Sequence, residues 1–166
     1  MSDMSCSTCR SLQGETVHIS LPSLPQFVSL ARLTVASVGN IVGFSIDVVE
    51  DLKVAVSEAC TNALRHGCSS EQCYDLYYQL DQDKLTIRVE DRGEGYEPES
   101  VSEPELPGNQ AGGFGLFIIK SLMDEVEIVS NKGMGTSITM VKYLRTYDGI
   151  SKSNDKTGIK KAVYRI

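Results

Sequence analysis

Residues 50–67 read EDLKVAVSEACTNALRHG, and their hydrophobic spacing decides the fold around them. Apolar residues recur here at intervals of three and four, which is typical of an amphipathic helix. The apolar stripe consists of Leu52, Ala55, Val56, Ala59, Cys60, Ala63 and Leu64. Asp47 and Glu50 have the spacing of a capping box, and Gly67 suits a left-handed residue at a helix end. We therefore predict a helix with one buried face over residues 50–67.

The opposite face of this predicted helix carries polar side chains. Glu58, Asn62 and His66 are four residues apart, so they align along one side of the helix. A carboxylate beside a carboxamide offers a general base and a neutral oxygen ligand, and Mg²⁺ takes oxygen ligands and completes its shell with substrate phosphates. The pair is therefore a candidate half-site for a metal-nucleotide, although such a pair is more often solvated surface when it stands alone.

The composition fits one globular domain with its own core. The chain has 166 residues, of which 41% are hydrophobic and 23% charged. The formal net charge of −6 disfavours direct nucleic-acid binding, which needs a basic surface. No apolar run approaches a membrane span and no signal-peptide pattern is present, so we expect a cytoplasmic protein without membrane contact. The five cysteines are odd in number and irregularly spaced, so we expect no disulfide framework, with free thiols at Cys6 and Cys9.

Two elements are predicted before residues 50–67. Residues 15–21 alternate apolar and polar, which is typical of a strand, with His18 on the polar side as a surface residue. Residues 23–43 predict a helix, and the short connection predicts that it packs on the next helix as a hairpin. The apolar stripe of this first helix is Phe27, Leu30, Ala31, Val35, Val38 and Val42.

Strand patterns and a last helix follow. Residues 72–80 and 84–91 predict an antiparallel hairpin around a polar turn at 81–83. Residues 125–130 and 136–143 predict a second hairpin. Between the two hairpins, a helical run passes through Ile118, Ile119 and Leu122.

Two glycine-containing segments connect these elements. DRGEGY at residues 91–96 follows a strand, and its glycines let the backbone turn and approach a ligand closely. The Asp91 carboxylate can accept a hydrogen bond from an exocyclic amine such as that of adenine. The long loop 96–112 is typical of a lid and ends in glycines that open a helix, where N–H groups and the helix dipole favour phosphate. Either segment alone also fits ordinary turn chemistry.

The order and spacing of these motifs resemble the GHKL family of ATP-binding domains, and most closely its anti-sigma factor serine kinase branch, of the RsbW and SpoIIAB type. The resemblance covers residues 15–144. It is carried by DLKVAVSEACTNALRHG (51–67), GGFGLFIIKSLMDEV (112–126) and GTSITMVKYL (135–144). It implies an α/β two-layer sandwich of the Bergerat type, with a mixed, mostly antiparallel sheet covered by helices on one face. Residues 1–14 would form a flexible leader and residues 145–166 a basic tail.

The resemblance also implies a role for individual residues. Glu58 is similar to the general base of the family, and Asn62 to its magnesium-binding Asn. Asp91 is similar to the adenine-reading Asp, which Thr136 would support through water. The implied nucleotide contacts further include Arg65, His66, Gly93, Gly95, Gly113, Phe114, Gly115 and Leu116. Arg32 in the first helix is implied as a contact to a partner protein.

The implied function is an ATP- and Mg²⁺-dependent protein serine kinase that is also an anti-sigma factor. It would sequester a sigma factor, phosphorylate a STAS-type antagonist protein on serine, and form a homodimer. Family members often have a basic lid residue, but residues 96–112 contain no Lys or Arg, so phosphate contacts would come from Arg92, Lys120 or backbone. Two alternatives remain: a non-catalytic, nucleotide-dependent module that binds a sigma factor, and a histidine-kinase catalytic domain, which the lack of a phosphoacceptor helix pair disfavours.

Overall fold

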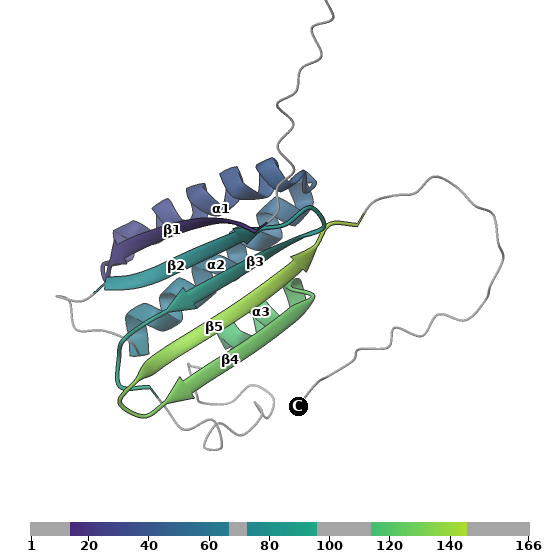
Figure 1. The fold of residues 1–166 in the computed structure, drawn as a ribbon. Helices are drawn as coiled ribbons and strands as arrows, with labels where there is room; N and C mark the ends of the chain where they lie inside the picture. The colour runs from purple at the N-terminus through teal and green to yellow at the C-terminus, as the bar shows by residue number, and fades with distance from the viewer. Residues whose placement is uncertain (1–13, 67–72, 96–113, 146–166) are drawn as a thin grey trace, which may run out of the picture.

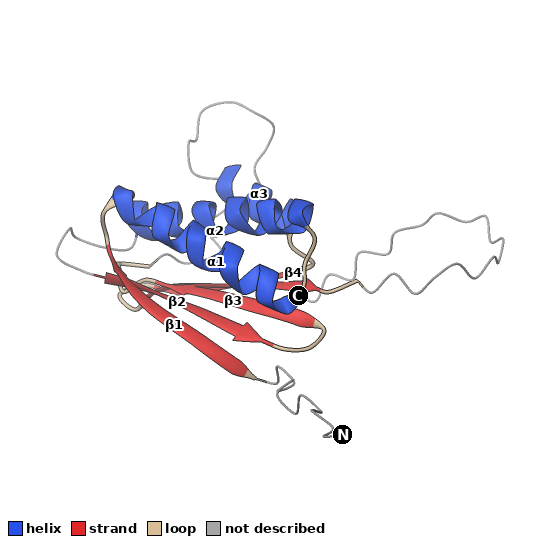
Figure 2. Cartoon of the chain, turned by 90° about the horizontal axis from the view of Figure 1, so that it is seen from above, coloured by secondary structure: helices blue, strands red, loops and turns tan. Residues whose placement is uncertain are grey.

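The computed structural model describes residues 14–66, 73–95 and 114–145, which form two layers (Figure 1). A five-stranded sheet in the order β1-β2-β3-β5-β4 makes one layer. All the helices of the described residues lie on the same face of this sheet (Figure 2). The strands are β1 (Glu15–Pro22), β2 (Cys73–Leu80), β3 (Lys84–Glu90), β4 (Glu125–Asn131) and β5 (Gly135–Tyr143). The helices are η1 (Pro25–Phe27), α1 (Val28–Val42), α2 (Ile46–His66) and α3 (Phe114–Leu122). The predicted α/β two-layer sandwich is confirmed.

Strand pairing is antiparallel throughout the described part of the sheet, rather than mixed. Both predicted hairpins are present, as β2–β3 and β4–β5. β3 does not pair with β4, the next strand in the chain, but with β5, and Glu90 lies opposite Ser137. This crossover places the end of β3 beside the start of β5, where the sequence has its Asp91 and Thr136 motifs.

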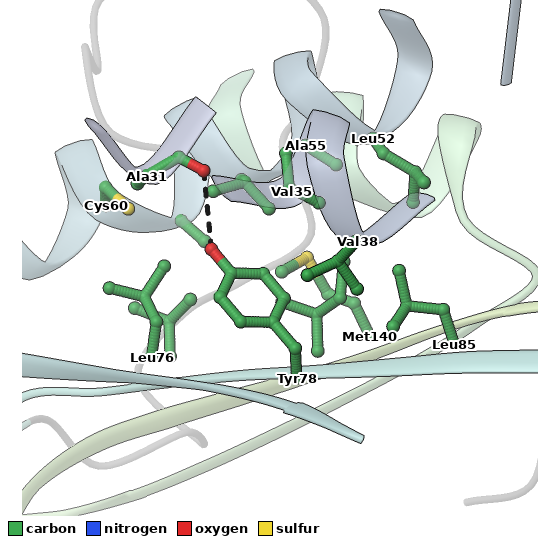
Figure 3. Packing of buried hydrophobic residues seen from close by; sticks show 14 of the residues in the cluster. Ala31, Val35, Val38, Leu52, Ala55, Cys60, Leu76, Tyr78, Leu85 and Met140 are labelled. Carbon is green, nitrogen blue, oxygen red and sulfur yellow. Dashed lines mark hydrogen bonds between the residues drawn. The ribbon is translucent and has the colours of Figure 1, made fainter. Parts of the chain in front are cut away.

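The core lies between the sheet and the helices (Figure 3). Alternate residues of β2 and β3, such as Leu76, Tyr78 and Leu85, point toward α1 and α2 and are buried. The Tyr78 hydroxyl donates to the Ala31 carbonyl over 3.3 Å and so ties the sheet to α1. Cys60 is buried as predicted, and this burial raises the pKa of its thiol to about 12.

Helix α2 begins at Ile46, four residues earlier than predicted. The proposed capping box at Asp47 and Glu50 is wrong, because Asp47 lies in the first turn and the Val48 N–H donates to the Ser45 hydroxyl over 3.4 Å. Asp47 still suits this position, since a carboxylate in the first turn interacts favourably with the helix dipole. Gly67, the predicted helix end, lies outside the described residues.

Helix α1 also differs in detail from the prediction. A 3₁₀ turn over Pro25–Phe27 precedes it, and Gly43 ends it with a left-handed φ of 97°. Leu30 was expected in the buried stripe but is 45% exposed. Ala31 is the first buried residue of α1. Successive residues of a helix point about 100° apart, so Leu30 points away from the sheet that Ala31 faces.

The predicted leader (1–14), lid (96–112) and basic tail (145–166) lie almost entirely outside the described residues, as do Cys6, Cys9 and Gly113. The boundaries of the predicted 15–144 domain therefore stay a prediction. Across the part of the chain that the structure describes, no helix is long and apolar enough to cross a membrane.

Candidate active site

The polar face of α2 meets the first turn of α3. Gly115 has a helical backbone there, and a Cβ placed on it would lie 2.9 Å from the Glu58 Oε2 and 3.6 Å from both amide atoms of Asn62. Two motifs more than fifty residues apart in the sequence are therefore in contact. The predicted base, the predicted oxygen ligand and the predicted phosphate-binding turn form one cluster, in which a side chain at position 115 would displace the Glu58 carboxylate.

Asn62 lies in this cluster with an unsatisfied amide. Its Nδ2 is buried and has no hydrogen-bond partner among the described residues. A buried polar group without a partner is costly, so such a group is expected to meet a ligand or water. A rotation of the amide would present its oxygen to the same point. The donor set at Glu58 and Asn62 fits a magnesium-nucleotide, which needs a protein oxygen next to phosphate oxygens.

Asp91 is the buried carboxylate at the end of β3, with 8% of its surface exposed. Its Oδ1 accepts from the Gly93 N–H over 2.9 Å and from the Thr136 N–H over 3.3 Å. Burial raises the pKa of Asp91, while these two N–H groups and the nearby charge of His66 act in the opposite direction. Both of these hydrogen bonds end on Oδ1, so Oδ2 can accept a hydrogen bond from a ligand.

Ser130 is a residue of this site that sequence reasoning missed. It is buried on β4 directly opposite Thr136 of β5, and the two hydroxyl oxygens are 3.0 Å apart. This hydrogen bond fixes the hydroxyl of Thr136, the residue whose backbone N–H donates to Asp91. A polar residue at the end of a strand, in register with the Thr of the Gly-Thr motif, was the available signal.

Two glycines allow the turns around Asp91 to lie against each other. Gly95 and Gly135 have left-handed φ values of 61° and 83°. A Cβ on Gly95 would overlap the Asn131 carbonyl, and one on Gly135 would overlap the Asp91 carbonyl. The requirement for glycine at both positions is therefore steric as well as conformational.

The other predicted contacts are distributed unevenly. Arg65 and His66 are exposed at the end of α2, and the influence of His66 on Asp91 places this end near the carboxylate. Leu116 packs partly on the core, whereas Phe114 is exposed. Arg32 is exposed on α1, and the structure records no contact between it and the cluster.

The two cations considered for the phosphates lie elsewhere. The Arg92 guanidinium is 3.3 Å from Asp75 Oδ2, and Asp75 belongs to the sheet face away from the helices. Lys120 lies in the last turn of α3, at the opposite end from Gly115. In this structure Arg92 is therefore paired with Asp75, and Lys120 is exposed at the far end of α3. The described residues also contain no group of three or more His, Cys, Asp or Glu that could hold a metal ion.

The comparisons with known proteins agree with this fold. A family profile described as histidine kinase-like ATPase domain matches residues 21–142. The chain is 39% identical over 138 residues to serine-protein kinase RsbW of Oceanobacillus iheyensis, covering 77% of this chain and 86% of the relative. It is 36% identical over 140 residues to the same kinase of Listeria innocua, covering 78% and 88%. The fold is similar, with a TM-score of 0.57 and 20% identity, to the RsbU and RsbW domains of a Mycobacterium tuberculosis protein, covering 82% of this chain and 35% of that one.

Proposed function

This chain belongs to the histidine kinase-like ATPase domain family, and from that membership we propose that it is an ATP-dependent protein serine kinase and anti-sigma factor. It sequesters a sigma factor and phosphorylates a STAS-type antagonist of the anti-sigma factor on serine. The similarity to proteins named serine-protein kinase RsbW supports this function. The observation that carries it is the contact of Glu58 and Asn62 with Gly115 at the start of α3.

Glu58 is the general base in this proposal. Phosphoryl transfer requires alignment of the attacking oxygen and neutralisation of charge more than covalent chemistry by the protein. A carboxylate beside the N-terminus of α3 can take the proton of an incoming serine hydroxyl while the helix N–H groups face the phosphates. Asn62 would offer an oxygen ligand to Mg²⁺, which when bound would neutralise charge on the phosphates.

Asp91 reads the adenine in this proposal. Its Oδ1 is occupied by two backbone N–H groups, so Oδ2 accepts from the exocyclic amine. Thr136, fixed by Ser130, supports the same edge of the base. Gly93 and Gly95 shape the turn, the backbone of Phe114 and Leu116 meets the phosphates, and Arg65 and His66 lie at the rim. A phosphate contact at Gly113 stays a prediction.

Partner binding is assigned to α1. Arg32 is exposed there beside Leu33, whose side chain is also exposed. We expect this surface to contact the sigma factor, and the active protein to be a cytoplasmic homodimer. Changing Arg32 to Glu should weaken sigma-factor binding in a pull-down and leave ATP binding unchanged.

The test of the kinase assignment compares Glu58→Gln with Glu50→Gln. Both glutamates lie on α2, but Glu50 is exposed and bonds Lys53, away from Gly115. We expect Glu58→Gln to bind ATP with magnesium in calorimetry yet to lose about 100-fold or more in transfer of labelled phosphate to the antagonist, while Glu50→Gln transfers normally. Wild-type transfer by Glu58→Gln would exclude it as the base.

The alternative of a non-catalytic module predicts a different result. The wild-type protein would then bind ATP and the sigma factor but transfer no phosphate to serine. Asn62→Ala tests the metal separately: the magnesium-dependent part of ATP affinity should fall, with little change in the melting temperature of the free protein.

A further inference from the structure

Asp75 is a buried carboxylate on the face of the sheet that no described helix covers. It lies on β2, between Ser20 of β1 and Glu90 of β3, and its side chain is 8% exposed. Its strand neighbours Tyr74 and Leu76 face the core instead. Carboxylates are almost never buried without a partner, because removing the charge from water is costly. The burial of Asp75 on this open sheet face therefore depends on neighbouring groups that pair with its charge.

One partner of Asp75 is a histidine on the neighbouring strand β1. His18 Nε2 lies 2.8 Å from Asp75 Oδ1, and its ring stacks on Tyr77 with centroids 4.3 Å apart and planes 5° from parallel. His18 is therefore more than the simple surface residue that the sequence suggested. Burial by itself would raise the pKa of Asp75, but the hydrogen bonds from His18 and Ser20 and the charges of His18 and Arg92 lower it below the ordinary value. The carboxylate is thus ionised at neutral pH.

A third partner of Asp75, besides His18 and Ser20, belongs to the turn that carries Asp91. Arg92 Nη2 lies 3.3 Å from Asp75 Oδ2, and Arg92 directly follows Asp91 in the chain. On the other side, Asp91 is bonded to Thr136. A hollow of about 290 Å³ extends behind this turn, and its lining includes Asp75, Asp91 and Arg92. The turn is therefore held from β5 on one side and from β2 on the other.

We propose that Asp75 is a positioning residue for nucleotide recognition, which holds Arg92 and so fixes the turn that presents Asp91 to the base. This inference rests on the proposed role of Asp91 in reading adenine. The Arg92 side chain is 80% exposed. When the contact with Asp75 is lost, this exposed side chain no longer holds the turn, and the glycines that follow it let the turn adopt other conformations. Asp91 then points correctly for a smaller fraction of the time, and the apparent affinity for adenine nucleotides falls by that fraction.

The experiment measures ATP and GTP affinities of the full-length chain by calorimetry, together with melting temperatures. The variants are Asp75→Asn, Arg92→Gln, the double variant, and His18→Asn as the control, which removes the bond of Asp75 to His18 and leaves Arg92 in place. We expect each of the first two to weaken ATP binding about three- to fivefold, since an exposed ion pair is weak. GTP affinity should change less, so selectivity for adenine falls. The double variant should be no worse than either single one, and His18→Asn should lower the melting temperature without changing ATP affinity.

Two results would overturn the inference. If Asp75→Asn lowers only the melting temperature, Asp75 is a structural residue; if the effects of Asp75→Asn and Arg92→Gln multiply, they do not act through one contact. A wild-type protein that binds no ATP would instead refute the proposed function, and this inference with it. That outcome is recognised before any variant is compared.

Discussion

Replacing Gly115 by alanine should separate the stability of α3 from the chemistry beside it. Gly115 has a helical backbone, and alanine is favoured over glycine in a helix by up to about 1 kcal/mol. The new Cβ would lie 2.9 Å from Glu58 Oε2, where ordinary contact begins at 3.4 Å. The carboxylate is the end of a flexible side chain, so it can move away at low cost. The variant should therefore fold as well as the wild type while its proposed base is displaced.

The two expected effects of Gly115→Ala are opposite: stability rises and phosphate transfer falls. A gain of up to about 1 kcal/mol would raise the melting temperature by about 2–4 °C. A displacement of a fraction of an ångström at the reacting groups should lower phosphate transfer about 10- to 100-fold at saturating ATP. The gain in the free energy of unfolding is measured by urea unfolding, and the loss of activity by transfer of labelled phosphate to the antagonist protein.

Ser121→Ala is the matched control for this variant. Ser121 is exposed on α3, and its hydroxyl donates to the Ile118 carbonyl over 2.7 Å, away from Glu58. Its replacement by alanine should leave transfer unchanged and should not reduce stability. Gly115→Ala with wild-type transfer would refute the reasoning, because the contact between Gly115 and Glu58 would then have no part in the chemistry.

Three further changes test the site and the core. Burial raises the pKa of Asp91, so its contribution to the free energy of unfolding is present at low pH and is lost as the pH rises through the raised pKa. Asp91→Asn should remove this loss when the free energy of unfolding is measured from pH 4 to 8. The same variant should weaken ATP binding about 10- to 100-fold. Gly135→Ala should lower the free energy of unfolding, measured in urea, by more than about 2 kcal/mol, and Gly133→Ala by only about 1 kcal/mol. Both glycines have a left-handed φ, but of the two only Gly135 has an atom in the way of a Cβ. Equal losses would exclude the steric explanation. Tyr78→Phe removes a buried hydroxyl that donates to α1 and should cost about 1 kcal/mol, and an unchanged unfolding midpoint would mean that this bond adds nothing.

The sequence by itself determined the local elements and the chemistry that each carries. The apolar stripe from Leu52 to Ala63 predicts α2, because a helix repeats every 3.6 residues and its buried face can be read from a short window. The same periodicity puts Glu58 and Asn62 on one side of that helix. Alternation predicts the strands, and the polar turns predict both hairpins. Element ends were less certain: Ser45 rather than Asp47 caps α2, because several nearby residues can accept the same N–H bonds.

Tertiary structure alone decided which of these pieces meet. β3 pairs with β5, which brings Asp91 to Thr136 and Ser130, and α3 docks on α2, which brings Gly115 to Glu58. It also turned Arg92 toward Asp75. No local period carries this information, because contacts between distant segments depend on how the whole chain closes its loops and buries its apolar faces together.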